Sequence, residues 1–505
     1  MYPTAEKIFE KLKRVSVRMP MVAALVPFVA GVLFFDRFSI PDIVVWAFCL
    51  MSCIAAALCS RRSVARSFIC AALFMFGGAV WSLGRQPVNI PYGKTALMEI
   101  EIADVPSQRA EGAVSVPVRI LSFDDGDGRL TSDCKAVLWS DGSVDMAFGD
   151  RITALTELRR FRSGNTSTYF NLMKRRGFAG TLFADGSDII SVEHGAGRRT
   201  LHRIAVERFS RLRLQPSTAA VAAAMGTGQR SGMTPELRDA YARSGVSHIL
   251  AISGLHIGIV FLLANLLFRP LVLLRHGQIW ARAAVLIPVW LYAAASGFSP
   301  SVVRAAVMFS LLQMSLVFSS YHFSLNTLAA AAFGMVAVNP DILFDVSFQL
   351  SFAAVTAIVA VGLPLCSAVE NCSLFLRCLL STFIIGAVAF VAATPLISHI
   401  FGRISPVGIL INPLVILSAY VIVTVSVLWI AVPLPFWQPV AERLLDFTVD
   451  LQNRIVDKAS ACEWLSFDAK LSTATVIFIY LLLAAAMFLF DTRSKKPKND
   501  YERGF

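Results

Sequence analysis

Charged residues are scarce in this chain, and that scarcity excludes an ordinary soluble globular protein. They make up 16% of its 505 residues, whereas a typical soluble domain has about 25%. Apolar residues reach 56%, above the usual share of about 45–50%. Most of the apolar runs lack a polar face at a period of 3.6 residues, so a soluble bundle of amphipathic helices is excluded as well.

Several motifs that carry chemistry are also missing. No G-x-x-x-x-G-K-[ST] sequence is present, which excludes an ATP site of that class; the GTGQRSG segment at 226–232 has no lysine after its glycines. No carboxylate cluster suggests nuclease metals, and the nine cysteines form no C-x-x-C pair. Cys134 has no second cysteine in its polar segment for a disulfide. We therefore expect no metal site, no cofactor and no catalytic residue.

What the chain does contain is a series of near-continuous apolar runs. A helix that crosses hydrocarbon needs about 20 apolar residues, and several runs reach that length. The runs lie at 21–35, 42–59, 67–83, 247–274, 279–296, 300–318, 324–338, 342–365, 379–401, 407–433 and 472–490. They predict a polytopic α-helical membrane protein.

The placement of basic residues predicts how the chain is oriented in the membrane. Lys and Arg precede the first run and recur at 61–66, between the second and third runs. Because cytoplasmic loops carry an excess of Lys and Arg, we expect a cytoplasmic N-terminus, so that the third run delivers residue 84 to the outside. No small-x-small cleavage site follows the first run, which favours a retained span over a signal peptide.

The polar segment 84–197 predicts a small extracytoplasmic β domain. Apolar and polar residues alternate in four stretches, with Asp-Gly turn signals between them. The stretches are 96–103, 113–121, 134–139 and 150–157. Their number and length fit an OB-like β-barrel. The acidic cluster at 124–127 lacks the spacing of a calcium loop, so we interpret it as a solvated turn.

Basic residues outnumber acidic ones between 151 and 214, on the face predicted to be outside. The positive-inside bias does not explain arginine there, whereas an anionic ligand or lipid phosphate does. Tyr169, Phe170 and Phe178 interleave with the basic residues, as on a surface that binds single strands. Ordinary aromatic core residues of a barrel explain them equally well. The DNA-binding candidates are Arg159, Arg160, Arg162, Tyr169, Lys174, Arg175 and Arg176.

Two short helices are predicted at 216–226 and 234–244, lying at the membrane interface. Thr234 as N-cap and Pro235 in the first helical position mark the start of the second one. That helix leads into HILAISGLHIGI at 248–259, an apolar stretch with two histidines and a Ser-Gly pair.

The Ser253-Gly254 pair predicts a broken helix. Freed backbone groups are tolerated in a membrane only where protein or water satisfies them, so His248, Ser253 and His256 are expected to border a water-accessible cavity. A Ser/His hydrolase lacks an acidic partner nearby and the G-x-S-x-G elbow. A two-histidine metal site lacks further ligands. Pore lining and helix packing are the remaining interpretations.

Other polar residues recur within the apolar segments, namely Arg304, Gln349, Asn326 and Asn412. Singly, each is explained by snorkelling or by an interhelical hydrogen bond. Together, they fit a polar path through one domain. The channel-lining candidates are His248, Ser253, Gly254, His256, Arg304, Gln349 and Asn412.

These segments resemble the ComEC-type DNA-uptake channel of bacterial natural transformation. The resemblance rests on AMGTGQRSGMTPELRDAYARSGVSHILAISGLHIGI, YAAASGFSPSVVRAAVM, LNTLAAAAF, NPDILFDVSFQLSFAAV and FGRISPVGILINPL, which occur in that order between 224 and 414. It implies an inner-membrane, multi-pass channel that passes single-stranded DNA into the cytoplasm. It also implies a periplasmic DNA receptor and cytoplasmic DNA-processing proteins as partners, and it assigns the channel-lining candidates to the pore.

The chain departs from this family in three ways. No histidine-rich metallo-β-lactamase-like tail is found, so no nuclease activity is expected; Cys134 alone cannot form the disulfide that some members hold; and the segment 162–177 lacks the usual Asn-Pro-Gly opening. A hydrolase using Ser253 and His256, or a small-solute or lipid transporter, remains the alternative.

The predicted organisation has six parts. They are N-terminal transmembrane segments at 1–83, the OB-like domain at 84–197, basic and interfacial helices at 198–245, a competence-type channel domain at 246–433, an amphipathic and transmembrane segment at 434–490 and a basic cytoplasmic tail at 491–505.

Overall fold

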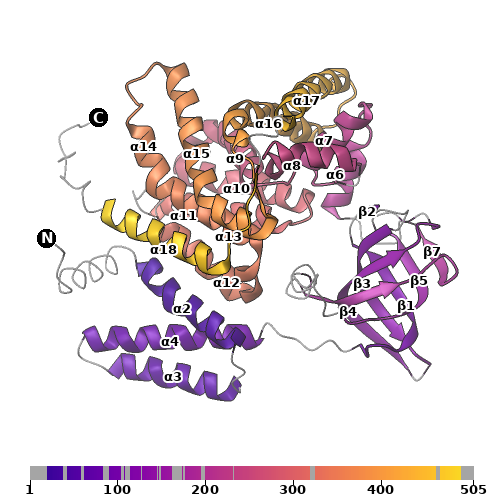
Figure 1. Cartoon of the computed structure of the whole chain (residues 1–505), viewed down its shortest axis with the longest axis horizontal. Helices are drawn as coiled ribbons and strands as arrows, with labels where there is room; N and C mark the ends of the chain where they lie inside the picture. Colours follow the sequence, from indigo (N-terminus) through magenta and orange to yellow (C-terminus); the bar gives the residue numbers. More distant parts are fainter. Residues whose placement is uncertain are drawn as a thin grey trace. The chain divides into compact units, whose positions relative to one another are not determined.

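A helix coincides with every apolar run of the sequence (Figure 1). The computed structural model describes residues 20–37, 42–58, 62–83, 90–103, 107–108, 114–126, 128–144, 146, 149–161, 173, 177–194, 200–230, 232–318, 325–461 and 467–490. The predicted tail at 491–505 and the basic N-terminal segment lie outside these residues. Six described helices are long and apolar enough to cross a membrane, so the chain is a multi-pass membrane protein.

Helical segments both precede and follow one sheet region. Before the sheet come α2 (Pro20–Arg37), α3 (Asp42–Leu58) and α4 (Arg62–Leu83). After it come α6 (Leu201–Phe209), α7 (Pro216–Gly226), α8 (Pro235–Arg243), the 3₁₀ helix η2 (Ser247–Ile249), α9 (Gly254–Phe268), α10 (Gly277–Ala295), α11 (Pro300–Phe318), α12 (Leu325–Val338), α13 (Val346–Ala357), α14 (Leu363–Ser367), α15 (Leu374–Phe401), α16 (Val407–Ala431), α17 (Gln438–Ser460) and α18 (Thr473–Phe490). The two short helices predicted before the Ser-Gly break are confirmed as α7 and α8.

Glycine allows α2 and α4 to pack at close range. A Cβ atom added at Gly31 would lie 1.9 Å from the Phe74 carbonyl oxygen, and one at Gly77 would lie 2.2 Å from that of Phe28. Small residues at helix contacts are typical of membrane proteins, where close backbone approach replaces the hydrophobic effect. Asn326 of α12 accepts a hydrogen bond from the Met21 backbone N–H, which fits its predicted role in helix packing.

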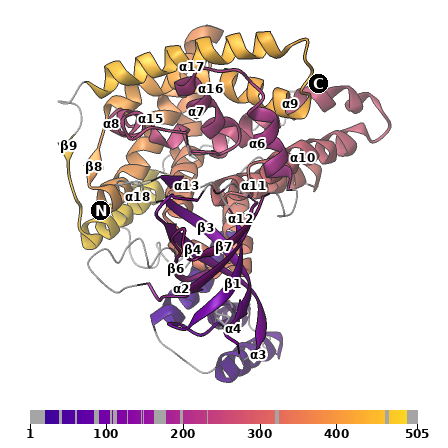
Figure 2. The same ribbon diagram turned by 90° about the vertical axis from the view of Figure 1, so that its right-hand side faces the viewer.

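The polar segment forms a curved sheet of seven strands (Figure 2). The strands are β1 (Thr95–Ile102), β2 (Ser107–Gln108), β3 (Val114–Asp124), β4 (Arg129–Ser140), β5 (Arg151–Glu157), β6 (Phe178–Phe183) and β7 (Ile189–Glu193). They run in the order β6-β4-β3-β1-β5-β7, with β2 on β3. The four predicted stretches are therefore confirmed as β1, β3, β4 and β5, whereas a closed barrel is not formed by the described strands.

Strand alternation divides the sheet into an apolar inside and a charged outside. Met98, Ile100, Val118 and Ile152 are completely buried in one cluster. Glu101 points to the opposite face of the sheet. Its neighbours there are Arg119 on β3 and Arg151 on β5, which lie directly across from it in the two strand pairings. This division is what a sheet needs in order to fold in water.

The predicted turn signals lie in turns of the sheet. Gly126 and Gly142 both have positive φ, a conformation that glycine adopts without strain. At the second turn, hydrogen bonds from Ser143 hold the pKa of the Asp141 carboxyl below its ordinary value. In the acidic cluster at 124–127, the Asp124 carboxylate accepts a hydrogen bond from the Gly126 N–H, as expected of a turn.

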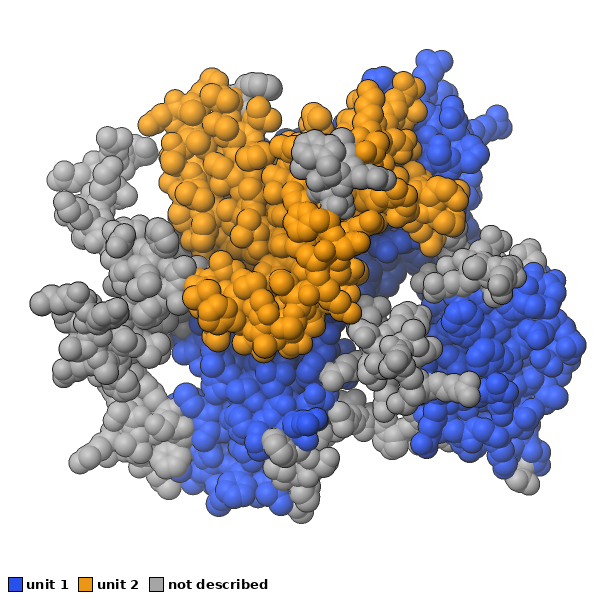
Figure 3. Space-filling view, viewed as in Figure 1, with its two compact units in different colours: residues 1–233, 249–349, 419–449 blue, residues 234–248, 350–418, 450–505 orange. Residues whose placement is uncertain are grey.

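The chain divides into two compact units (Figure 3). Unit 1 contains residues 1–233, 249–349 and 419–449, and unit 2 contains residues 234–248, 350–418 and 450–505. The sheet and α9 to α12 belong to unit 1, whereas α8, α15 and α18 belong to unit 2.

Candidate functional site

The chain is not helical between Ile249 and Gly254, and Ser253 is the N-cap of the helix that follows. The 3₁₀ helix η2 ends at Ile249 and α9 begins at Gly254. The Ser253 hydroxyl accepts a hydrogen bond from the Leu255 N–H, and His256 Nδ1 accepts one from the Ser253 N–H at 3.3 Å. The two residues form a capping box, which satisfies donors that the first turn of a helix leaves free.

The His256 side chain is completely buried in this conformation. Its Nδ1 lies 3.2 Å from the Ser253 hydroxyl, close enough for a hydrolase pair. Because Nδ1 already accepts a backbone N–H, the capping role accounts for the contact without catalysis. No cluster of three or more His, Cys, Asp or Glu side chains able to hold a metal occurs among the described residues.

The break packs against α11, the helix that carries Arg304. A Cβ atom at Gly254 would contact the Ala305 side chain at 3.9 Å. Ser301 donates a hydrogen bond to the Ile252 carbonyl at 2.5 Å. The candidates Ser253, Gly254 and His256 therefore lie beside the start of α11.

Arg304 is one of the largest fully buried side chains, with 1% of its surface exposed. Its Nη2 donates to the carbonyl and to the hydroxyl of Ser347, at 2.9 and 2.5 Å. The buried Asp345 carboxylate accepts from the Ser347 and Phe348 N–H groups at the start of α13. The Arg304 guanidinium and the Asp345 carboxylate are thus both bonded to Ser347. Arg304 is held in the interior by these contacts and does not snorkel to the membrane surface.

The remaining lining candidates belong to three different helices. Gln349 is half-buried and donates through Nε2 to the Leu343 carbonyl at 3.0 Å. His248 is exposed in η2, and Asn412 is half-buried in α16; both belong to unit 2. The Asn412 Oδ1 atom is buried and has no hydrogen-bond partner within the described part of the chain.

Two of the predicted DNA-binding residues lie on aromatic rings at the sheet. Arg159 lies over the Phe183 ring at 5.2 Å and pairs with Glu157. Arg160 lies over the Tyr92 ring at 4.7 Å. Both residues are exposed. Guanidinium groups stacked on rings beside the sheet are a common feature of single-strand binding surfaces. The candidates Arg162, Tyr169, Lys174, Arg175 and Arg176 lie outside the described residues, as does Phe170.

The ring partners were missed by reasoning from the sequence. Phe183 ends β6 and is 47% exposed, although it stands between the buried Leu182 and Ala184. These three residues are all apolar, so the sequence contains no signal for the exposure of the ring. Its register partner on β4 is Trp139. Tyr92 precedes β1 and donates to the Ala179 carbonyl, a contact that only the fold reveals.

Some arginines of the basic segment have structural roles instead. Arg203 pairs with Glu207 one turn later in α6, at 3.0 Å. Arg208 donates to the Ile430 carbonyl at 2.6 Å, and Trp429 donates through its indole N–H to the Arg208 carbonyl. Arg208 therefore caps the end of α16, where a cation also offsets the helix dipole.

Comparisons with known proteins find matches in the sequence of the chain. The family model described as Competence protein matches residues 225–493. ComE operon protein 3 of Bacillus subtilis (strain 168) is 33% identical over 147 residues, which is 29% of this chain and 18% of that protein. The matched part is thus well under two thirds of that relative's length. No solved structure matches the chain.

Proposed function

The chain belongs to the Competence protein family, and from this we propose that it is an inner-membrane channel that passes single-stranded DNA into the cytoplasm during natural transformation. The family match over 225–493 carries the proposal, since it covers the broken segment at 249–254 and the helices that follow. In the proposed arrangement the N-terminus is cytoplasmic and the sheet is extracytoplasmic.

The sheet supports the proposal as the part that captures the strand. Arg159 and Thr181 exchange two backbone hydrogen bonds of 2.9 Å, which join the end of β5 to β6. This bridge favours an OB-like, partly open barrel. Arg159 and Arg160, on their rings, offer charge for phosphates and flat surfaces for bases.

We also propose that the chain is not a hydrolase. The Ser253–His256 contact is explained by helix capping, and Ser253 is half-buried where the segment turns into α9. A transporter of small anions or lipid remains the second candidate, supported by the same exposed arginines. Flux of labelled DNA strands against small anions in liposomes separates these two functions.

Charge reversal at the sheet tests the proposal directly. We expect the double variant Arg159→Glu and Arg160→Glu to bind single strands more weakly, with a salt slope reduced by about 0.7 for each phosphate that is no longer neutralised. Arg119→Glu is the matched control, because Arg119 lies within β3, whereas Arg159 and Arg160 follow the end of β5; Arg119 and Arg159 are both in ion pairs, so the control also reverses a paired charge. Equal binding by the double variant, the control and the parent chain rejects the capture role.

Loss of the whole protein tests the channel role. We expect cells without it to bind donor DNA at the surface as before, while no strand reaches the cytoplasm. Undiminished arrival of donor DNA in the cytoplasm of such cells overturns the proposal.

A further inference from the structure

α16 and α17 form an antiparallel helical hairpin. Only residues 432–437 connect them, and so short a connection makes consecutive helices antiparallel neighbours. In unit 1 the Trp429 and Trp437 rings pack at the closed end, with centroids 5.6 Å apart. In unit 2 the Ser418 hydroxyl donates to Gln452 Oε1 at 2.5 Å.

The open end of the hairpin is marked by Arg243 of α8. Ser405, just before α16, donates to the Arg243 carbonyl at 2.7 Å. Ser460, the last residue of α17, lines the same cavity as Arg243. The start of α16 and the end of α17 therefore both lie near Arg243, which agrees with an antiparallel pair.

α16 has the character of a helix that crosses lipid. It is the most apolar of the six candidate spans. Its 25 residues extend about 37 Å, more than the hydrocarbon thickness of about 30 Å. Leu410, Leu414, Leu417 and Val421 are exposed at helical spacing along one side. A partner that follows α16 along its length must run through the same depth of membrane.

α17 has three distinct faces, although its sequence looks too polar for a span. One face, which includes Gln452, is buried. A second is an apolar stripe in which Val440, Leu444, Phe447 and Leu451 are each 42% to 70% exposed; the exposed Lys458 lies in the same arc, in the last turn of the helix. The third, which we call the charged flank, consists of Arg443, Asp450, Arg454 and Asp457, all exposed. At 100° per residue the stripe and the flank occupy adjoining arcs of about 60° each.

The charged flank needs water wherever it lies within the membrane. A charged side chain at the centre of a bilayer costs about 2.5–3.5 kcal/mol, and such residues face water-filled cavities or pair with one another. Asp450 and Arg454 do pair, at 2.8 Å, yet their side chains remain 57% and 73% exposed. The pair offsets the charges only in part, because the exposed atoms still require a polar surrounding.

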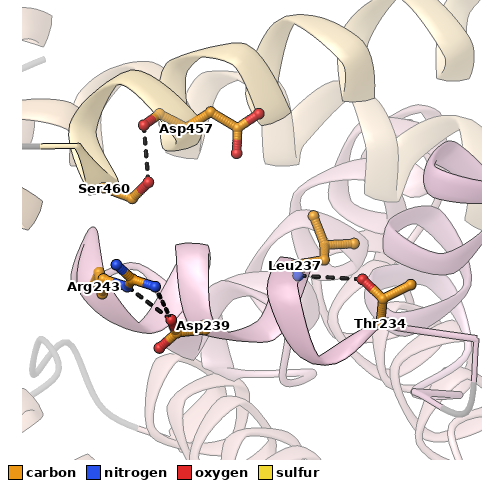
Figure 4. Close-up of polar contacts among 6 residues, drawn as sticks. All are labelled: Thr234, Leu237, Asp239, Arg243, Asp457 and Ser460. Atoms are coloured by element: carbon orange, nitrogen blue, oxygen red, sulfur yellow. Dashed lines mark hydrogen bonds and ion pairs between the residues drawn. The ribbon is translucent and has the colours of Figure 1, made fainter.

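An open pocket lies beside the last residue of α17, in unit 2. Its volume is about 430 Å³, and α8 contributes Glu236, Asp239 and Arg243 to its wall. Figure 4 shows the Arg243–Asp239 ion pair of α8, with Asp457 and Ser460 on α17. The Nε atom of Arg243 donates to Asp239 Oδ2 at 2.7 Å, so the charged groups of α8 are held together.

We propose that α17 crosses the membrane beside α16 and that its charged flank lines a water-filled groove, which the α8 cavity continues at one end. The apolar stripe then faces lipid, like the exposed side of α16. This inference goes beyond the proposed function, since the groove depends on the hairpin and not on what passes along it.

Cysteine labelling of the full chain in sealed liposomes of phosphatidylcholine and phosphatidylglycerol tests the groove. Single substitutions Arg443→Cys and Arg454→Cys report on the flank, with Val440→Cys and Leu451→Cys as matched controls on the stripe; the parent chain gives the background of native cysteines. We expect a membrane-impermeant maleimide to label the flank about tenfold faster than the stripe, because hydrocarbon excludes a charged reagent. Flank positions that label as slowly as the stripe overturn the groove.

Depth measurement separates a crossing helix from one that lies flat. Fluorophores on Val440→Cys and Leu451→Cys lie about 17 Å apart along the axis of α17. We expect nitroxides on lipid head groups to quench the first more strongly, and nitroxides at mid-chain to quench the second. Equal quenching at both positions places α17 flat at the interface and overturns the crossing. Either result leaves the DNA-arrival test of the proposed function unaffected.

Discussion

The sheet and the helical region are built in opposite ways. In the sheet, Ile100 and Val118 are completely buried, while Glu101 and Arg119, which are register partners on the opposite face, are only half-buried. In the helical region the leucines of α16 are exposed, whereas Arg304 is buried. The sheet has the arrangement of a domain that folds in water, and the helices have that of a protein in lipid. The sheet therefore has an apolar interior and a charged surface, whereas the helical region has buried polar contacts and an apolar surface.

The largest expected effect of this difference is at Arg304. We expect Arg304→Ala to destabilise the helical region by about 3–5 kcal/mol, because it leaves buried polar partners around Ser347 without their cation. The measurement is thermal unfolding of the purified protein in detergent. Arg304→Lys keeps the charge but loses the planar donor geometry, so an intermediate loss is expected.

Ile100→Ala is the matched control in the sheet. Removal of this buried side chain is expected to cost about 2–5 kcal/mol through reduced apolar burial and a new cavity, with no polar group left exposed inside. If Arg304→Ala unfolds at the same temperature as the parent chain, buried polar contacts do not hold the helical region together and the contrast fails.

A second test places a lysine on the exposed surface of each region. Leu417 near the middle of α16 and Leu155 on the outside of β5 are 66% and 50% exposed. We expect Leu417→Lys to reduce membrane insertion by about 2.5–3.5 kcal/mol, as for a lysine near a span centre. Leu155→Lys is expected to change stability by no more than about 0.5 kcal/mol, since the side chain already faces water.

Insertion of the α16 segment, scored by a glycosylation-site reporter, measures the first variant, and thermal unfolding measures the second. Similar small effects at both positions show that Leu417 faces water or protein. That outcome contradicts the assignment of this side of α16 to lipid.

The sequence predicted the features that depend on local pattern. Apolar runs located the helices, alternation located β1, β3, β4 and β5, and the Ser253-Gly254 pair located the break. Thr234 does cap α8, accepting from the Leu237 N–H, as its position before Pro235 indicated. Each of these signals lies within a few residues of the structure it specifies.

Contacts between distant segments could not be predicted in the same way. Arg304 meets Ser347 across 43 residues, and Arg159 meets Phe183 only because β6 lies beside the end of β5. The apolar stripe of α17 was hidden by the charged residues between its apolar positions. The sequence shows that Arg304 and Arg159 are unusual for their surroundings. The partner of each one depends on tertiary packing, which the sequence does not show.

The smallest expected effect compares the same serine substitution in the two regions. Ser253→Ala removes a capping hydroxyl at the start of α9 and is expected to cost about 1 kcal/mol, while transport continues. Ser143→Ala removes hydrogen bonds in an exposed turn of the sheet, where water replaces the hydroxyl, so its effect on stability is expected to stay within about 0.5 kcal/mol. Thermal unfolding and DNA arrival in the cytoplasm are measured for both variants. Loss of all transport in a folded Ser253→Ala protein favours a nucleophile over a cap, because a channel tolerates this change and a hydrolase does not.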